Sequence, residues 1–209
     1  MRLKILLVCF LMAALPAAAQ PVCEVLAVRG EAFVGARALA VGDKLERGAE
    51  LRTGVQGRVR LRFVDGSTLV LSDATLLKIE QFEQASGQPR KAGLLLEMGL
   101  IGQKVTPSPG GSWQVRTPTA VTAVRGTEFI VEVDEDQATA VNVQSGQVSV
   151  EAVVAPSSSA TRALRTPRSR VMLDDAQAGT RCSAVGGCSA SSTWSPERVQ
   201  RSQDRLAGV

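Results

Sequence analysis

The chain has 209 residues, a formal net charge of +4, 44% hydrophobic residues and no histidine. The missing histidine excludes a Ser-His-Asp triad, a Cys-His pair and every histidine-ligated metal site. An enzyme would be left with a carboxylate pair or a Ser-Lys dyad, and neither has a recognisable motif here, so we expect a protein that is not an enzyme and holds no metal or cofactor.

The first residues have the layout of an export signal. Arg2 and Lys4 give a positive start, Ile5 to Leu15 is apolar, and Ala17 to Ala19 offers a cleavage site of small residues. The apolar run is too short for a bilayer, and no later stretch reaches the roughly 20 apolar residues of a spanning helix. We predict a signal peptide over residues 1–19 and no membrane span. Basic and acidic residues nearly balance after its removal, so nucleic acid is not an expected partner.

Short strands separated by turns are predicted from residue 23 to residue 152. Nineteen glycines and many short Val and Leu alternations favour β structure. Arg58 to Phe63 alternates strictly, which places its apolar residues on one face. Asp65-Gly66 then predicts a two-residue hairpin turn of the primed type. Gln84 to Ala92 is polar and predicts a loop, and Leu94 to Val105 resumes the apolar pattern.

Three arginines share the other face of the first of these strands. Arg58, Arg60 and Arg62 repel one another unless acids lie across from them on neighbouring strands. A solvated face balanced by its neighbours is the plain interpretation, because exposed charge rows usually bind nothing specific. The functional alternative is a docking patch for an acidic partner or an anionic polymer, which makes these three arginines candidate binding residues.

The stretch from Trp113 to Val133 changes character partway. Thr117-Pro118 ends a first short strand, since proline removes a ladder donor and restricts the residue before it. Arg125-Gly126-Thr127 then separates two apolar segments, and a glycine there is expected where φ is positive or another backbone comes close. If Arg125 is buried it needs an acidic partner, for which Glu128 is a candidate. The plain interpretation is a structural corner, and the alternative is an anion- or partner-binding arginine.

A weak internal repeat places a glycine three residues after an apolar residue and before a new alternation. It recurs at Ala27/Gly30, Leu96/Gly99 and Val143/Gly146. Repeated strand-turn-strand units predict an all-β fold, a solenoid- or roll-like stack of short strands. A two-sheet β-sandwich produces the same local pattern and remains the alternative.

Composition changes after residue 152. Residues 153–170 are rich in Pro, Ser and Arg and predict a flexible linker. In an exported protein, Cys182 and Cys188 with two glycines between them predict a local disulfide. Cys23 is then either free, paired between chains or exchanging with the other two.

A short helix is predicted near the C-terminus, within an extension over residues 171–209. Ser195 is a good N-cap and Pro196 suits the first helical position. Trp194 and Val199 fit the two positions of a hydrophobic staple. Because so short a helix is unstable alone, we expect it to dock on the body or on a partner.

The segment T-P-T-A-V-T-A-V-R-G-T-E-F, from Thr117 to Phe129, resembles the signature of the FecR domain family, periplasmic all-β modules of Gram-negative bacteria. The resemblance extends to V-G-D-K-L-E-R-G-A-E-L-R-T-G at Val41 to Gly54, to F-V-D-G-S-T-L-V-L at Phe63 to Leu71 and to V-Q-S-G-Q-V-S-V at Val143 to Val150. It implies a FecR-like domain over residues 23–152 in the periplasm and favours the solenoid-like arrangement. The structural signature residues are Thr117, Pro118, Arg125, Gly126, Thr127 and Phe129.

FecR-family proteins are associated with signalling across the envelope, through an inner-membrane span and a cytoplasmic arm that controls a sigma factor. This sequence departs from that pattern, because it shows a cleavable signal and neither of those parts, which makes a free-standing sensor or adaptor the alternative to direct sigma-factor regulation. The resemblance implies a non-enzymatic periplasmic sensor or adaptor that binds a protein partner in envelope signalling. The alternatives are an envelope scaffold that assembles as a homo-oligomer and a cell-wall glycan-binding protein. A glycan hydrolase using acids such as Glu128 is the least favoured reading.

Overall fold

The computed structural model describes residues 20–85, 87–153 and 170–209. These residues form eighteen strands and one short C-terminal helix, which confirms the all-β prediction. The predicted signal peptide lies outside the described residues, as does the predicted linker apart from its two end positions.

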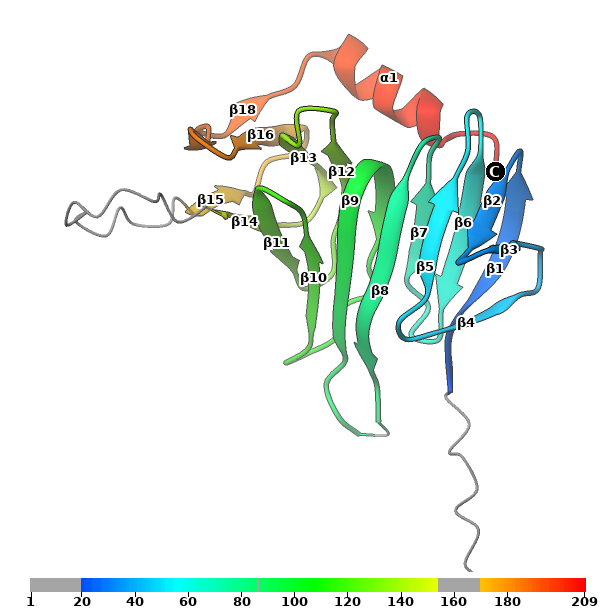
Figure 1. The fold of residues 1–209 in the computed structure, drawn as a ribbon. Helices are drawn as coiled ribbons and strands as arrows, with labels where there is room; N and C mark the ends of the chain where they lie inside the picture. Colours follow the sequence, from blue (N-terminus) through cyan, green and yellow to red (C-terminus); the bar gives the residue numbers. More distant parts are fainter. Residues whose placement is uncertain (1–19, 86, 154–169) are drawn as a thin grey trace, which may run out of the picture.

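The strands are connected into one open array that folds over into two layers, called here sheet A and sheet B (Figure 1). The strands of sheet A are β1 (Pro21–Arg29), β4 (Lys44–Glu46), β6 (Arg58–Phe63), β7 (Thr68–Leu71), β9 (Lys91–Lys104), β12 (Glu128–Val133), β13 (Thr139–Ser145), β16 (Ala178–Ser183), β17 (Gly187–Cys188) and β18 (Ser192–Thr193). Their order is β4, β1, β6, β7, β9, β12, β13 and β16, with β17 and β18 both paired to β16.

The strands of sheet B are β2 (Ala32–Val34), β3 (Arg37–Ala38), β5 (Glu50–Thr53), β8 (Leu76–Glu83), β10 (Ser112–Arg116), β11 (Ala120–Val124), β14 (Val148–Ala152) and β15 (Arg170–Leu173). Their order is β3, β2, β5, β8, β9, β10, β11, β14 and β15. The β9–β10 pairing is parallel, and the other pairings named here are antiparallel.

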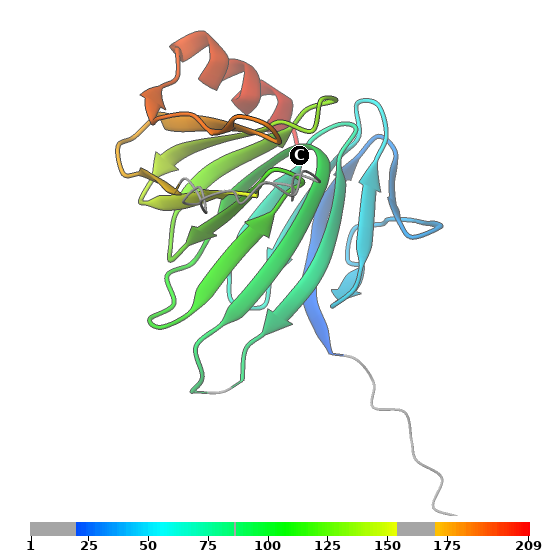
Figure 2. The same ribbon diagram turned by 60° about the vertical axis from the view of Figure 1, so that its left-hand side comes forward.

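Strand β9 belongs to both layers. Its residues up to Met98 pair with β8 in sheet B, and its residues from Gly99 pair with β12 in sheet A. Figures 1 and 2 show β9 near the middle of the strand array, with the other strands on either side. The fold therefore has two facing layers, as a β-sandwich does, but one continuous series of paired strands runs through both layers, as in a roll.

The repeated glycines mark the places where the chain passes from one layer to the other. Gly30 separates β1 from β2, Gly99 divides β9, and Gly146 separates β13 from β14; their φ angles are +64°, +98° and +89°. Gly126, between β11 and β12, makes a fourth crossing with φ of +128°. A residue with a side chain is strained at such φ angles, which explains why glycine recurs where the chain changes layer.

The space between the layers holds the core. Val59, Leu61 and Phe63 of β6 all point into it, as the strict alternation predicts. The ring of Phe63 stacks on Phe82 at 5.3 Å between centroids and meets the edge of Trp113 at 5.0 Å. Aromatic contacts of this kind add to the burial of apolar surface that joins the two layers.

The C-terminal part of the chain continues both layers. Strand β15 extends sheet B beside β14, and β16 extends sheet A beside β13. Helix α1 (Pro196–Leu206) begins at Ser195, whose side chain accepts a hydrogen bond from the Arg198 amide. Trp194 and Val199 pack against Ala140 on the outer face of sheet A, so the staple residues also dock the helix on the body (Figure 2).

The turn after β6 differs from the prediction. Gly66 has a positive φ and Asp65 does not, whereas a primed two-residue turn needs a positive φ at its first central residue in type II′ and at both central residues in type I′. The amide of Gly66 donates to Phe63 O and that of Phe63 to Ser67 O, which gives a three-residue loop ending in a left-handed glycine. The Asp65 side chain accepts from the Ser67 amide at 3.0 Å, and this local bond favours the wider loop.

Replacing Gly99 with alanine is expected to destabilise the whole fold. The new Cβ would lie 2.5 Å from Thr75 Cα at a strained φ, and crowding plus strain should lower the free energy of unfolding by about 3 kcal/mol. Gly42→Ala is the matched control, because φ is +88° there and nothing lies within 4 Å of the added atom. Urea denaturation measures both variants, and equal losses would show that the close approach at Gly99 is unimportant.

Candidate partner-docking face

The outer face of sheet A carries two rows of side chains that run across the strands. In the first row, successive strands align Arg60, Val70, Gly102, Ile130 and Asn142. In the second row they align Arg62, Thr68, Lys104, Glu128 and Ser145. Two of the three predicted binding arginines therefore stand at the same end of neighbouring rows.

Arg58, the third of them, has a structural role. Its Nε donates to the carbonyl oxygen of Arg205 at 2.5 Å, while Ser72 Oγ, which donates to Asp73 Oδ1 at 2.6 Å, lies 3.0 Å from the same carbonyl oxygen. The bond from Arg58 satisfies a carbonyl in the last turn of α1, where no intrahelical donor remains.

The side chain of Arg205 fastens the helix end to sheet A. Its Nη1 lies 2.5 Å from a Glu132 oxygen and its Nε lies 3.4 Å from Asp73. Burial works to raise the pKa of Asp73, but the Ser72 hydrogen bond and the Arg205 charge outweigh it and lower that pKa. The end of α1 is thus held by several polar contacts in addition to the apolar ones at its start.

A groove of about 420 Å³ lies beside this helix end. Val70, Gly102 and Ile130 line it from the sheet, and Leu206 lines it from the helix. A Cβ on Gly102 would lie 2.7 Å from Leu206 Cδ1, so the absence of a side chain there lets the helix approach the strand. Arg60 and Leu26 also line the groove, while Arg58 and Arg62 do not.

The charged residues of the two rows differ in whether an opposite charge lies beside them. Arg62 lies 3.5 Å from Glu24, and Lys104 stands directly across from Glu128 in the register of β9 and β12. Arg60 is exposed, and no acid of the described residues forms an ion pair with it. Of the predicted arginine patch, Arg60 is the residue whose charge stays available to a partner.

Arg125 departs from the expectation of a buried, paired arginine. It is exposed at the corner between β11 and β12, and the described part of the chain contains no ion pair between it and Glu128. An exposed guanidinium is solvated by water, which removes the need for a partner. Gly126 occupies the corner, and a Cβ there would lie 2.8 Å from Pro107 Cγ.

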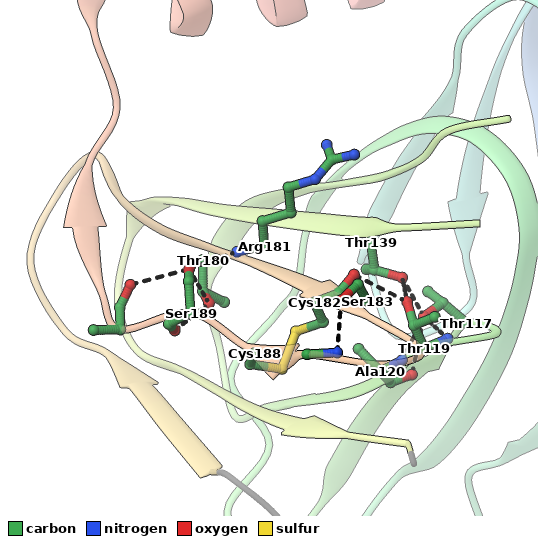
Figure 3. Close-up of a disulfide and its surroundings, with 12 residues drawn as sticks. Thr117, Thr119, Ala120, Thr139, Thr180, Arg181, Cys182, Ser183, Cys188 and Ser189 are labelled. Carbon is green, nitrogen blue, oxygen red and sulfur yellow. Dashed lines mark hydrogen bonds between the residues drawn. A yellow bond between two sulfur atoms is a disulfide. The ribbon is translucent and has the colours of Figure 1, made fainter. Parts of the chain in front are cut away.

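The threonines of the signature connect strands. Thr117 and Thr119 hydroxyls lie 2.6 and 2.7 Å from the Thr139 hydroxyl, and Thr119 also donates to Cys182 O at 3.3 Å. Figure 3 shows this cluster beside the disulfide. Thr127 Oγ1 donates to Gln147 O at 2.9 Å, and Phe129 is buried in the core. These signature residues therefore hold the architecture together.

The cysteines are arranged largely as predicted. Cys182 and Cys188 form a disulfide that closes the β16–β17 hairpin. Cys23 is free and buried in β1 between β4 and β6. Burial disfavours the thiolate and raises the pKa of the Cys23 thiol to about 12.

A buried ion pair went unpredicted. Arg90 Nη1 hydrogen-bonds the Asp65 carboxylate and donates to Thr106 O at 2.8 Å, and the Arg90 and Asp65 side chains are 1% and 4% exposed. The guanidinium carbon of Arg90 lies 5.3 Å from the centre of the Trp113 ring. Arg90 lies in a polar stretch that predicts a loop, so the sequence around it gives no indication that its side chain is buried.

The described residues lack two further features. No three His, Cys, Asp or Glu side chains gather there in a way that would hold a metal ion. The same residues contain no helix with the length and apolar character needed to cross a membrane.

The geometry defines an all-β module that carries, on one sheet face, an apolar groove bordered by an exposed arginine. Residues 49–149 match the family model described as FecR protein, and this part of the chain is a FecR domain. The resemblance carried by the signature from Thr117 to Phe129 is thereby confirmed. No curated protein matches the chain in sequence.

Solved structures share the fold. Two crystal structures of a putative anti-sigma factor from Parabacteroides distasonis ATCC 8503 are similar to this chain, with TM-scores of 0.56 and 0.55 and 19% sequence identity in both cases. Each similarity covers 72% of this chain and 62% of that chain. At this identity the similarity concerns the fold alone, and this chain spans less than two thirds of that protein.

Asp65→Asn should destabilise the protein strongly. It leaves the Arg90 charge buried without a counter-charge, which costs about 3–5 kcal/mol of unfolding free energy. Glu24→Gln is the matched control, because it breaks the exposed pair with Arg62 and should leave stability close to wild type. Chemical denaturation tests both, and a small loss in Asp65→Asn would contradict a stabilising role for the buried pair.

Cys23 should resist alkylation in the native protein. Its buried thiol with a pKa of about 12 presents almost no thiolate at neutral pH, whereas denatured protein should react fully with iodoacetamide. Since the folded pKa is raised from 9.0, the unfolded chain loses the proton first, and stability should fall as pH rises from 9 towards 12. Mass spectrometry of the labelled peptide gives the result, and rapid native labelling would contradict the burial.

Proposed function

We propose that this FecR-domain protein is an exported, non-enzymatic sensor or adaptor in the periplasm, and that it binds a protein partner in envelope signalling through the outer face of sheet A. The FecR domain and the fold shared with a putative anti-sigma factor support a regulatory role. The leader-like first residues support export. The groove beside α1 supports a protein-binding role, because it combines an apolar floor with an unpaired cation.

The single observation that supports a docking face on sheet A is the exposure of Arg60 together with its missing ion-pair partner among the described residues. Its exposed guanidinium stands at the edge of an apolar groove without an acidic partner among the described residues. Arginine is enriched at protein interfaces, where a planar guanidinium binds carboxylates with defined geometry.

On the outer face of sheet B, Arg52 is exposed and forms no ion pair among the described residues, but its guanidinium carbon lies 4.5 Å from the centre of the Phe33 ring. Two other cations of this face have acidic partners. Lys78 lies 2.8 Å from Glu50, and Arg116 lies 3.2 Å from Glu80. Charges that satisfy one another across strands stabilise a solvated face and leave less for a partner. This contrast favours sheet A as the docking face.

Affinity capture from cell envelopes tests the proposal. We expect the wild-type protein to recover one envelope protein reproducibly, and Arg60→Glu to recover about tenfold less of it, because charge reversal turns attraction into repulsion. Arg47→Glu is the control, since it makes the same charge change at an exposed turn between β4 and β5. Equal recovery by all three would refute the docking face, and recovery of the protein itself or of cell-wall fragments would favour a scaffold or a glycan binder.

A further inference from the structure

We propose that the groove beside the end of α1 binds an acidic, apolar peptide segment of the protein partner, with a carboxylate on Arg60 and apolar side chains on the floor. This inference rests on the proposed function, since it names the chemistry of the partner at the same face. Three features of the groove support it: the composition of its floor, the balance of its charges and the way its walls are held.

The floor of the groove is apolar and drawn from separate elements. Leu26 comes from β1, Val70 from β7, Ile130 from β12 and Leu206 from α1. Leu26, Val70 and Leu206 are partly exposed, so an apolar side chain placed on them would remove their remaining surface from water. A purely polar ligand would leave this surface exposed, which makes an apolar component part of the recognised chemistry.

The uncompensated positive charge of the groove favours an acidic ligand. Lys104 and Glu128 both line it and stand across from each other in register, so they largely compensate. Arg60 belongs to the row whose other members, Val70, Gly102, Ile130 and Asn142, are uncharged. The uncompensated charge is therefore one guanidinium, and a carboxylate is the group that pairs with it in two parallel hydrogen bonds.

The walls of the groove are held before any ligand arrives. Arg205 ties the helix end to Glu132 and Asp73, and Gln203 Nε2 donates to Gln144 Oε1 at 2.9 Å across the helix–sheet boundary. A preformed wall lowers the ordering cost of binding. The occupant meets a rigid corner between helix and sheet, which a short segment fits better than a broad surface does.

The mode of binding follows from the position of the groove in the sheet. Strands β6, β7, β9 and β12 each pair with neighbours on both edges, so their backbone groups are already used. A segment lying on this face is recognised by side chains, and strand addition to the sheet is not available to it here. Side-chain recognition makes the composition of the segment decisive, which allows a composition-based test.

A displayed library of random peptides, selected on the purified protein, is the probe. We expect the selected peptides to combine Asp or Glu with Leu, Ile, Val or Phe. Resynthesised peptides should bind Arg60→Glu about tenfold more weakly and lose affinity as salt rises. Leu26→Ser should weaken binding several-fold without changing the salt dependence, and Arg47→Glu should bind as wild type does. Circular dichroism of each variant verifies that it is folded.

Other outcomes overturn the inference. Selection of basic peptides, no selection at all, or equal affinity for wild type and Arg60→Glu would each refute an acidic segment in the groove. Dimerisation that Arg60→Glu abolishes, or binding of peptidoglycan fragments in place of peptides, would assign the groove to a second copy or to a glycan. If envelope capture depends on Arg60 while the library yields no acidic peptide, the docking face stands and the acidic segment is wrong. If acidic peptides are selected while capture fails, the groove chemistry stands and the signalling partner is wrong.

Discussion

Strand β9 takes part in both layers, and the arrangement of the other strands follows from this. Because one continuous strand pairs with β8 at its start and with β12 at its end, its backbone hydrogen bonds join the two layers. The chain changes layer at Gly99, where the backbone has a positive φ and lies against Thr75. The same change recurs at Gly30, Gly126 and Gly146, so the molecule is a chain that passes repeatedly between two faces around one core.

This arrangement separates architecture from recognition. Inward side chains of both sheets form the core, and the family signature reinforces it through hydroxyl bonds such as that between Thr117 and Thr139. Outward side chains take no part in this core, and on sheet A they form two rows across the strands. The helix that follows β18 closes one side of this face and so turns a flat surface into a groove.

The arginines also differ in whether they stabilise the fold. The ion pair of Arg90 and Asp65 is buried, and it holds the loop between β8 and β9 against the turn after β6. Arg205 does the same for the helix end. Arg60 takes no part in such a pair among the described residues, and this difference between structural and unpaired arginines is what distinguishes a candidate binding residue from its neighbours Arg58 and Arg62.

Local rules of alternation, backbone angle, redox chemistry and capping were enough to predict the all-β class, the glycine corners, the inward face of β6, the disulfide and the start of α1. The FecR signature was also readable, since it is a contiguous pattern. Which arginines form ion pairs or hydrogen bonds, in contrast, depends on the tertiary structure. Arg90, Arg58 and Arg60 look alike in sequence, but burial and ion pairing depend on strands that are distant along the chain. The groove likewise exists only because α1 returns to lie across sheet A, a contact between residues such as Gly102 and Leu206 that no local pattern records.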